Sequence, residues 1–143
     1  MQPRLLFVFP LLIVAMTALL PRTGVSGELA ADLQEAIHKA APTESLPVII
    51  QFRERVKLVR SRGETQTAFR LRYNQILKAT ADRSQATLTE WLNGQGVPAL
   101  RQIWTLNALA GRIPAQLLRE LAQRPEVESV RLDREIPMVP AQR

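Results

Sequence analysis

Apolar positions recur along this chain with two different spacings. A spacing of three or four residues, which predicts an amphipathic leading helix, is formed by Leu29, Leu33, Ile37 and Ala40. Pro42 follows and is expected to end this helix. The next apolar run, "LPVIIQF" at residues 46–52, is continuous and β-branched. That pattern predicts a strand buried on both faces or nearly so.

The longest helical pattern covers residues 64–93 and contains no internal proline and no glycine. Its apolar stripe consists of Tyr73, Leu77, Ala81, Leu88 and Trp91, with Ile76, Thr80 and Leu92 beside it. Such a helix would be about 45 Å long, so we expect a bend or a frayed start. The sequence "NGQG" (93–96) supplies residues that tolerate left-handed backbone at its end.

A hairpin is expected next. In "ALRQIWTL" (99–106), strand alternation places Leu100, Gln102, Trp104 and Leu106 on one face, and Arg101, Ile103 and Thr105 on the other. Asn107 can adopt the positive φ of a tight turn, but Ala108 cannot do so cheaply, so a bulge or a wider loop is possible.

The remaining pattern is a helix, a strand and a tail. Pro114 suits the first turn of a helix whose inward side chains are Leu117, Leu118 and Leu121. "EVESVRL" (126–132) predicts a last strand with Val127 and Val130 as its apolar positions. Two prolines in residues 133–143 predict an extended tail.

The order of these elements predicts an α+β fold. From residue 46 onward it reads βαββαβ, which is typical of a ferredoxin-like antiparallel sheet with its helices on one face. The leading helix is added in front of this unit. No segment remains to cover the other face of the sheet, and this uncovered face is the most informative expectation.

The front of the chain resembles a secretory signal. A cation, Arg4, precedes the apolar run 5–20, and the small residues "VSG" follow at 25–27. The alternative is a retained anchor, but the run is interrupted by Pro10 and is shorter than the roughly 20 residues of a spanning helix. We therefore expect a signal at 1–27, cleavage before Glu28, and a secreted or periplasmic protein. A leading helix and linker (28–45), a domain (46–136) and an extended tail (137–143) would follow.

The net charge is +6, and much of the excess lies in residues 53–72, which hold seven cations and two anions. One interpretation is a solvated loop and helix start. The other is an interaction module that contacts an acidic polymer or a membrane surface. Only one aromatic residue, Phe69, lies among these cations, which does not make an interleaved set of stacking platforms, so a nucleic acid partner is not expected.

The chain has little catalytic chemistry. It has no cysteine and one histidine, His38, so a Cys/His nucleophile pair and the common zinc sites cannot be built. Glu126 and Glu128 are two apart in the predicted last strand and should share a solvated face. Trp91 and Trp104 are expected in the core. We expect no enzyme, no cofactor and no metal.

The order and spacing of four blocks resemble the propeptide domain of subtilisin-like serine proteases, the inhibitor I9 family, especially those that precede bacillopeptidase-F-like enzymes. The blocks, within residues 46–136, are "LPVIIQF", "RSQATLTEWLNGQG", "IWTLNALAGRIP" and "LLRELAQRPEVESVRLDREI". The resemblance implies a non-enzymatic, monomeric inhibitor or folding chaperone of a subtilisin-like (S8) protease, and a relic without its partner is a further possibility. Its sheet would lie on two protease helices and its tail would enter the substrate cleft.

Carried onto this chain, the resemblance assigns the sheet contact to segments 101–105, 109–112 and 126–131. The alternation leaves open which residues face outward. Candidate contacts are Ile103 and Thr105, with Glu126 and Glu128 as an acidic pair that would cap the protease helices. The cleft-binding tail would be Asp133, Arg134, Glu135, Ile136, Pro137, Met138, Val139, Pro140, Ala141, Gln142 and Arg143.

Overall fold

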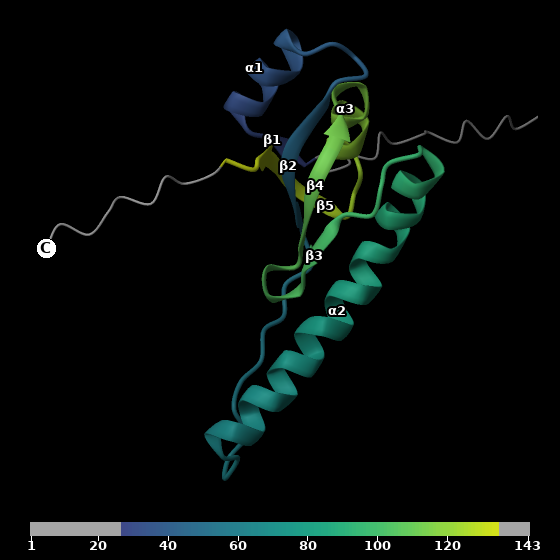
Figure 1. The fold of residues 1–143 in the computed structure, drawn as a ribbon. Coiled ribbons are helices and arrows are strands. Elements are labelled where there is room, and N and C mark those ends of the chain that lie inside the picture. Colours follow the sequence, from purple (N-terminus) through teal and green to yellow (C-terminus); the bar gives the residue numbers. More distant parts are fainter. Residues whose placement is uncertain (1–26, 135–143) are drawn as a thin grey trace, which may run out of the picture.

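A computed structural model describes residues 27–134, which form an α+β unit with a five-stranded mixed sheet (Figure 1). The elements are β1 (Glu28–Leu29), α1 (Ala31–Lys39), β2 (Ser45–Phe52), α2 (Gln66–Gly94), β3 (Arg101–Ile103), the 3₁₀ helix η1 (Trp104–Leu106), β4 (Ala108–Pro114), α3 (Ala115–Ala122) and β5 (Val127–Leu132). The expected strand, helix, strand, strand, helix, strand order from residue 46 is therefore present.

The strand order across the sheet is β1-β5-β2-β4-β3. The central strand, β2, is antiparallel to both of its neighbours, β4 and β5, and β3 is antiparallel to β4. It follows that β3 is parallel to β2, and β5 is parallel to β4. Each of these parallel pairs is connected through a helix, α2 or α3, and has one other strand between its members.

The expectation of a wholly antiparallel sheet is wrong at one edge, where β1 pairs in parallel with β5. Leu29, expected in the leading helix, is instead a strand residue opposite Val130. Ala30 has extended backbone (φ −58°, ψ 143°), and its N–H donates to the carbonyl of Val130 at 3.0 Å. The helix begins after this residue, at Ala31, because the ψ of Ala30 is extended, and the Ala30 carbonyl then accepts from the Gln34 amide at 3.0 Å.

The core lies on one face of the sheet. Val48, Ile50 and Phe52 of β2 are fully buried there, while the residues between them are only half-buried. The strand is thus buried on one face rather than two. Helix side chains that join the same cluster are Leu33 of α1, Leu88 and Leu92 of α2, and Leu117, Leu118 and Leu121 of α3. Burying each such side chain contributes about 1.5–3 kcal/mol, so this face is the main stabilising contact of the fold.

The three leucines of α3 are buried as predicted, and so are Val127 and Val130 of β5. Two strand residues three apart would normally face opposite sides. The register shifts between Gln51 and Phe52 of β2, which pair with Ser129 and Val127, so β5 has one extra residue there. This β-bulge allows both valines to point into the core.

Helix α2 is continuous from Gln66 to Gly94, about 44 Å at 1.5 Å per residue. Its start is capped, since the Thr65 side chain accepts a hydrogen bond from the Ala68 amide at 3.2 Å. Gly96, just after its end, has φ +74°, which confirms the left-handed stop. The buried residues of α2 all lie in its second half, at Thr80 and beyond.

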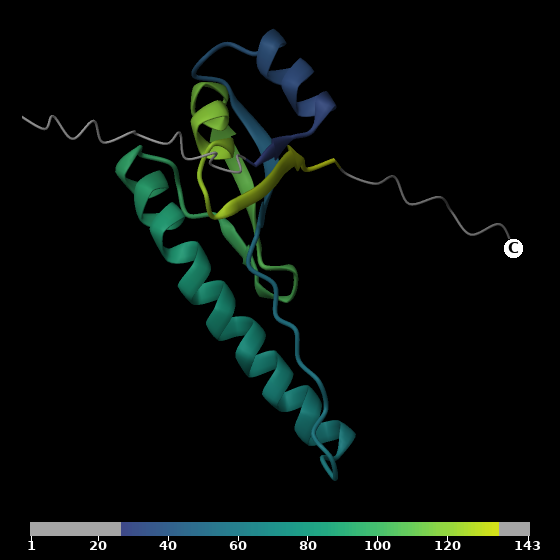
Figure 2. The same cartoon turned by 180° about the vertical axis from the view of Figure 1, so that it is seen from behind.

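The first half of α2 extends past the sheet together with the extended segment that follows β2 (Figures 1 and 2). The two run side by side and are joined by a turn at Gly63, which has φ +81°. We call residues 53–79 the arm and the rest of the described chain the body. None of the arm residues is buried.

The predicted alternation through residue 106 is wrong after Ile103. The strand ends there, and Trp104, Thr105 and Leu106 form the 3₁₀ helix η1. Leu106 is 53% exposed and Trp104 is half-buried outside the core cluster, so neither points into the core as expected. Asn107 adopts φ 46° and ψ 60°, the left-handed conformation predicted for it, and closes a turn wider than two residues.

Candidate functional site

The strand register places three rows of side chains on the face of the sheet opposite the core. The middle row is Arg101, Ala110, Ile49 and Arg131. Beside it lie Ile103, Ala108, Gln51 and Ser129 in one row, and Arg112 and Pro47 in another. We call these residues the open face. The buried leucines of α1, α2 and α3 all join the core cluster, so the described helices pack on the other side of the sheet.

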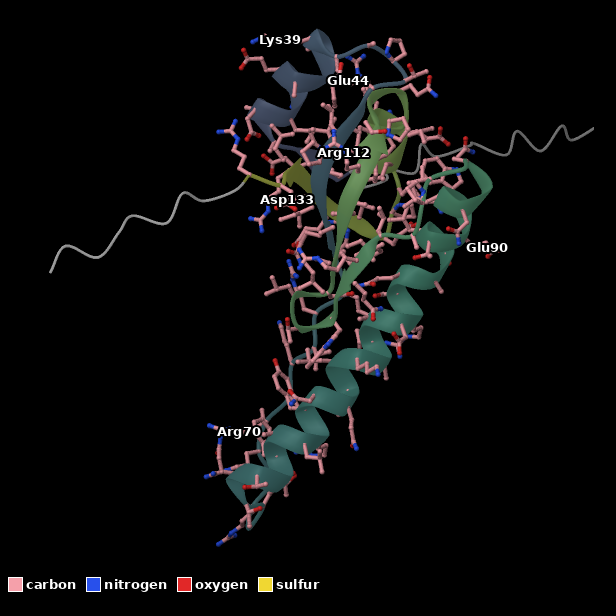
Figure 3. All side chains as sticks on the ribbon, viewed as in Figure 1. Lys39, Glu44, Arg70, Glu90, Arg112 and Asp133 are labelled. Carbon is pink, nitrogen blue, oxygen red and sulfur yellow. The ribbon has the colours of Figure 1, made fainter. Side chains whose placement is uncertain are left out.

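The open face has a small, apolar centre and a cationic rim. Ala108 is 0% and Ala110 3% exposed, although the buried leucines of the described helices all join the core on the other face. Ile49 beside them is half-buried. The rim arginines are exposed, and in Figure 3 the labelled Arg112 lies at the sheet, where its Nη2 donates to the Ser45 carbonyl at 2.7 Å. A partner on this face would therefore meet Ile49 and the exposed arginines rather than the two alanines.

Of the two predicted apolar contacts, only Ile103 lies on the open face. It is half-buried and pairs with Ala108. Thr105 is exposed on η1, at the end of the hairpin. Together with side chains from the arm and from the end of β2, it lines a hollow of about 190 Å³. The two residues are therefore near each other along the chain but not on one strand face.

The two predicted carboxylates are separated, each with its own arginine. Glu126 precedes β5 and accepts a hydrogen bond from Nε of Arg124 at 2.7 Å. That arginine also stacks over the ring of Trp91, 5.1 Å from its centroid. Glu128, within β5, is bonded to Arg55 of the arm. Spacing alone indicated one shared face, but Glu126 is outside the strand and the bulge interrupts the alternation.

Only the first two residues of the predicted tail are described. The amide of Asp133 donates to the Pro47 carbonyl at 3.0 Å and so extends the pairing of β5 with β2. Arg134 forms an ion pair with Asp32 of α1, 3.0 Å from Nη2 to Oδ2. The predicted tail residues outside the described part of the chain are Glu135, Ile136, Pro137, Met138, Val139, Pro140, Ala141, Gln142 and Arg143.

Sequence reasoning missed a buried polar network around Asn107, which is 6% exposed. Its Oδ1 accepts from Oγ of Ser84 at 3.0 Å and from Nε2 of Gln85 at 2.9 Å, while its Nδ2 donates to the Glu54 carbonyl at 2.9 Å. Gln102 of β3 in turn donates to Oε1 of Gln85 at 3.0 Å. The network joins α2, the hairpin and the base of the arm. The sequence indicated only the turn.

A second cluster lies in the arm. Arg72 donates to both oxygens of Glu64, at 2.9 Å and 2.8 Å. These bonds, and a weaker one from the Ser61 amide, lower the pKa of Glu64 from 4.5 to about 2, and the same pairing raises the pKa of Arg72. The pair connects the turn of the arm to the first half of α2.

Within residues 27–134, no group of three or more His, Cys, Asp or Glu side chains is close enough to hold a metal ion. His38 is exposed on α1, next to Lys39. No helix in this part of the chain is both long enough and apolar enough to cross a membrane.

Comparison with known proteins gives no relative: no protein-family model, no curated protein and no solved structure matches this sequence.

Proposed function

We propose that this protein is an exported, non-enzymatic inhibitor or folding chaperone of a subtilisin-like serine protease. The open face would contact the protease, and the tail that follows β5 would enter the substrate cleft. The observation that carries the proposal is the sheet face with an apolar centre and a charged rim, on which no described helix packs.

The finer fold that we propose is ferredoxin-like. In its favour, the four strands β2 to β5 have the order β5-β2-β4-β3 and are connected by α2 and α3 in the βαββαβ sequence. The short β1 and the helix α1 are then additions at the β5 edge. The core cluster joins α2 and α3 on one face, as this arrangement requires.

The shape and chemistry of the open face suit a protein partner. A contact of standard size, roughly 800 Å² from each side, needs a well-packed centre surrounded by polar groups. Ile49 and Ile103, both half-buried, provide the accessible apolar part of the centre, whereas Ala108 and Ala110 are too buried to add contact area. Arginine at the rim makes bidentate pairs with carboxylates, so the partner surface should carry acidic residues around its point of contact.

The carboxylates fit the proposal unequally. Glu128 lies in β5 and could exchange Arg55 for the N-terminus of a partner helix, where negative charge is favoured. Glu126 is held by Arg124, which also covers Trp91. We therefore propose Glu128 as the capping residue and a stabilising role for Glu126. Ile103 would contribute an apolar contact, and Thr105 would lie at the margin.

Inhibition assays test the proposal directly. Residues 27–143, which keep every contact described above, would be titrated against a panel of subtilisin-like proteases beside a form truncated after Leu132. We expect slow, tight inhibition that the truncation abolishes, because a product-like tail pairs with the cleft as an added strand. Failure of the folded protein both to inhibit and to raise the refolding yield of any of these proteases would overturn the proposal.

Two charge reversals locate the contact. Arg101→Glu changes the rim of the open face, and Arg119→Glu makes the same change of charge on α3, away from that face. We expect the inhibition constant to rise at least about 10-fold for Arg101→Glu, the scale of a lost charged hydrogen bond, and to stay unchanged for Arg119→Glu. Equal effects would show that the open face is not the contact.

Export is a separate part of the proposal. Residues 1–26 lie outside the described part of the chain, so we infer export from the sequence pattern of these residues alone. Expression of the full chain in a bacterial host, followed by N-terminal sequencing of the exported protein, should give Glu28 as the first residue. An intact Met1 in the membrane fraction would instead show a retained anchor.

A further inference from the structure

We propose that the far end of the arm, residues 57–72, binds an anionic lipid surface. We call this segment the arm tip. It is distinct from the open face and does not depend on the protease proposal: in Figure 3, Arg70 of the arm tip lies near one end of the molecule and Arg112 of the open face lies at the sheet.

The arm tip is internally supported although none of its residues is buried. The rings of Phe69 and Tyr73 stack, with centroids 5.8 Å apart and planes 8° from parallel. Arg72 covers Phe69 at 5.6 Å and is tied to Glu64 across the turn. The extended segment is joined to α2 by two further bonds: Arg72 donates to the Val59 carbonyl at 3.4 Å, and Arg60 donates to Oε1 of Gln66 at 3.3 Å.

The charges left over at the arm tip are all positive. Its one anion, Glu64, is taken up by Arg72, and at the base of the arm Glu54 is bonded to Arg83 and Arg55 to Glu128. Four cations remain, none of which lies within ion-pair distance of a described carboxylate: Lys57, Arg60, Arg62 and Arg70. This concentration of unpaired cations fits an anionic surface.

Two exposed apolar side chains stand among these cations. Val59 is 85% exposed and Leu71 is 62% exposed. An acidic polymer offers such side chains no apolar partner, whereas the boundary between lipid headgroups and acyl chains accepts them while arginines bind the phosphates. A folded acidic protein is a poorer fit, because the narrow end of one helix and one extended segment is small beside the roughly 800 Å² of a standard interface.

The experiment is vesicle co-sedimentation of residues 27–143, with phosphatidylcholine vesicles that contain or lack phosphatidylglycerol. We expect binding only to vesicles with phosphatidylglycerol, weakening as salt is added. In the triple variant Arg60→Gln, Arg62→Gln, Arg70→Gln, partition should fall roughly 100-fold, about five-fold for each cation near the surface.

The matched control removes the same charge from the open face: Arg101→Gln, Arg112→Gln, Arg131→Gln. Its partition should stay within about two-fold of the unchanged protein, since these arginines would be beyond a Debye length of the lipid. Thermal unfolding of both triple variants checks that they are folded. All six arginines are exposed, and each triple includes one that donates a hydrogen bond: Arg60 to Gln66, and Arg112 to the Ser45 carbonyl.

Three results would overturn the proposal. Equal binding to both kinds of vesicle would exclude charge as the cause, and equal losses in the two triple variants would exclude the arm tip as the site. Binding to polyglutamate without binding to phosphatidylglycerol vesicles would assign the cations to an acidic polymer instead. Protease inhibition is measured on the same variants to keep the lipid proposal separate from the proposed function. Replacement of the three arm-tip arginines should leave inhibition unchanged even where it abolishes lipid binding.

Discussion

The body and the arm of this protein are stabilised in different ways although one helix, α2, belongs to both. The body buries a continuous apolar cluster drawn from β2, β4, β5 and the three α-helices. Between residues 53 and 79, by contrast, no side chain is buried. The arm is held by a few surface contacts: a stacked ring pair, an arginine over a ring and one doubly bonded ion pair.

The difference shows how one helix can serve two packing environments. In the first half of α2, Tyr73 lines a hollow together with Val56 of the extended segment, and in the second half Leu88 and Leu92 enter the core. Local opening of a structure requires little free energy where few apolar contacts are buried. The arm should therefore open on its own while the body unfolds only as a whole, and the following predictions test that contrast.

The largest effect is expected from Phe52→Ala. Phe52 is 0% exposed at the end of β2, and loss of its ring should lower the free energy of unfolding by about 4 kcal/mol. Denaturant unfolding followed by circular dichroism measures this. The whole domain should respond in one transition. A loss below about 1 kcal/mol would mean that the core is not centred on β2.

A smaller loss is expected at the junction of body and arm. Asn107→Ala removes three hydrogen bonds from a residue that is 6% exposed and also strains its left-handed backbone. We expect a loss of about 3 kcal/mol in urea unfolding, because Gln85 is left buried without its partner. Asn107→Gly keeps the backbone relaxed, so it should recover about 1 kcal/mol. Equal values for the two variants would exclude backbone strain.

Phe69→Ala should act on the arm alone. The ring stacks on Tyr73 but is only half-buried, so global stability should fall by about 1 kcal/mol or less. Hydrogen exchange and limited proteolysis should instead show faster opening between residues 53 and 79. Phe52→Ala provides the comparison, since it should accelerate exchange everywhere. Uniform acceleration by Phe69→Ala would remove the distinction between arm and body.

The smallest effect is a pH dependence confined to the arm. Because Arg72 lowers the pKa of Glu64 from 4.5 to about 2, the folded arm favours the ionised carboxylate. Its contribution is full above about pH 4.5 and is lost as the pH falls toward 2. The protection factors of arm amides, which correct for the intrinsic pH dependence of exchange, should fall over this window. In Glu64→Gln this fall should be absent, and its persistence there would point to another group.

The sequence was most informative where a local pattern and the tertiary environment agree. Leu117, Leu118 and Leu121 are buried because a helix that packs on a sheet needs one apolar stripe, and spacing alone specifies that stripe. Asn107 was recognisable as a turn residue because few other side chains tolerate positive φ. These features depend on neighbours along the chain.

The candidate site was harder to predict because it depends on pairing between distant segments. The register of β2, β4 and β5 decides that Ala108, Ala110 and Ile49 share the open face, and spacing left the orientation open. Trp104 and Leu106 were expected inward because an uninterrupted strand was assumed, yet η1 turns them away. A bulge in β5 similarly separates Glu126 from Glu128.

The sequence by itself therefore determined the order of the elements, the apolar stripe of α3, part of the stripe in the second half of α2, the turn at Asn107 and the basic excess of residues 53–72. The tertiary structure alone decided the parallel pairing of β1, the inward set of each strand, the partner of each carboxylate and the separation of arm from body. The physical reason is range: periodicity and backbone preference act within one helical turn or one hairpin, whereas register, bulges and ion pairs are fixed by contacts between segments far apart in the chain.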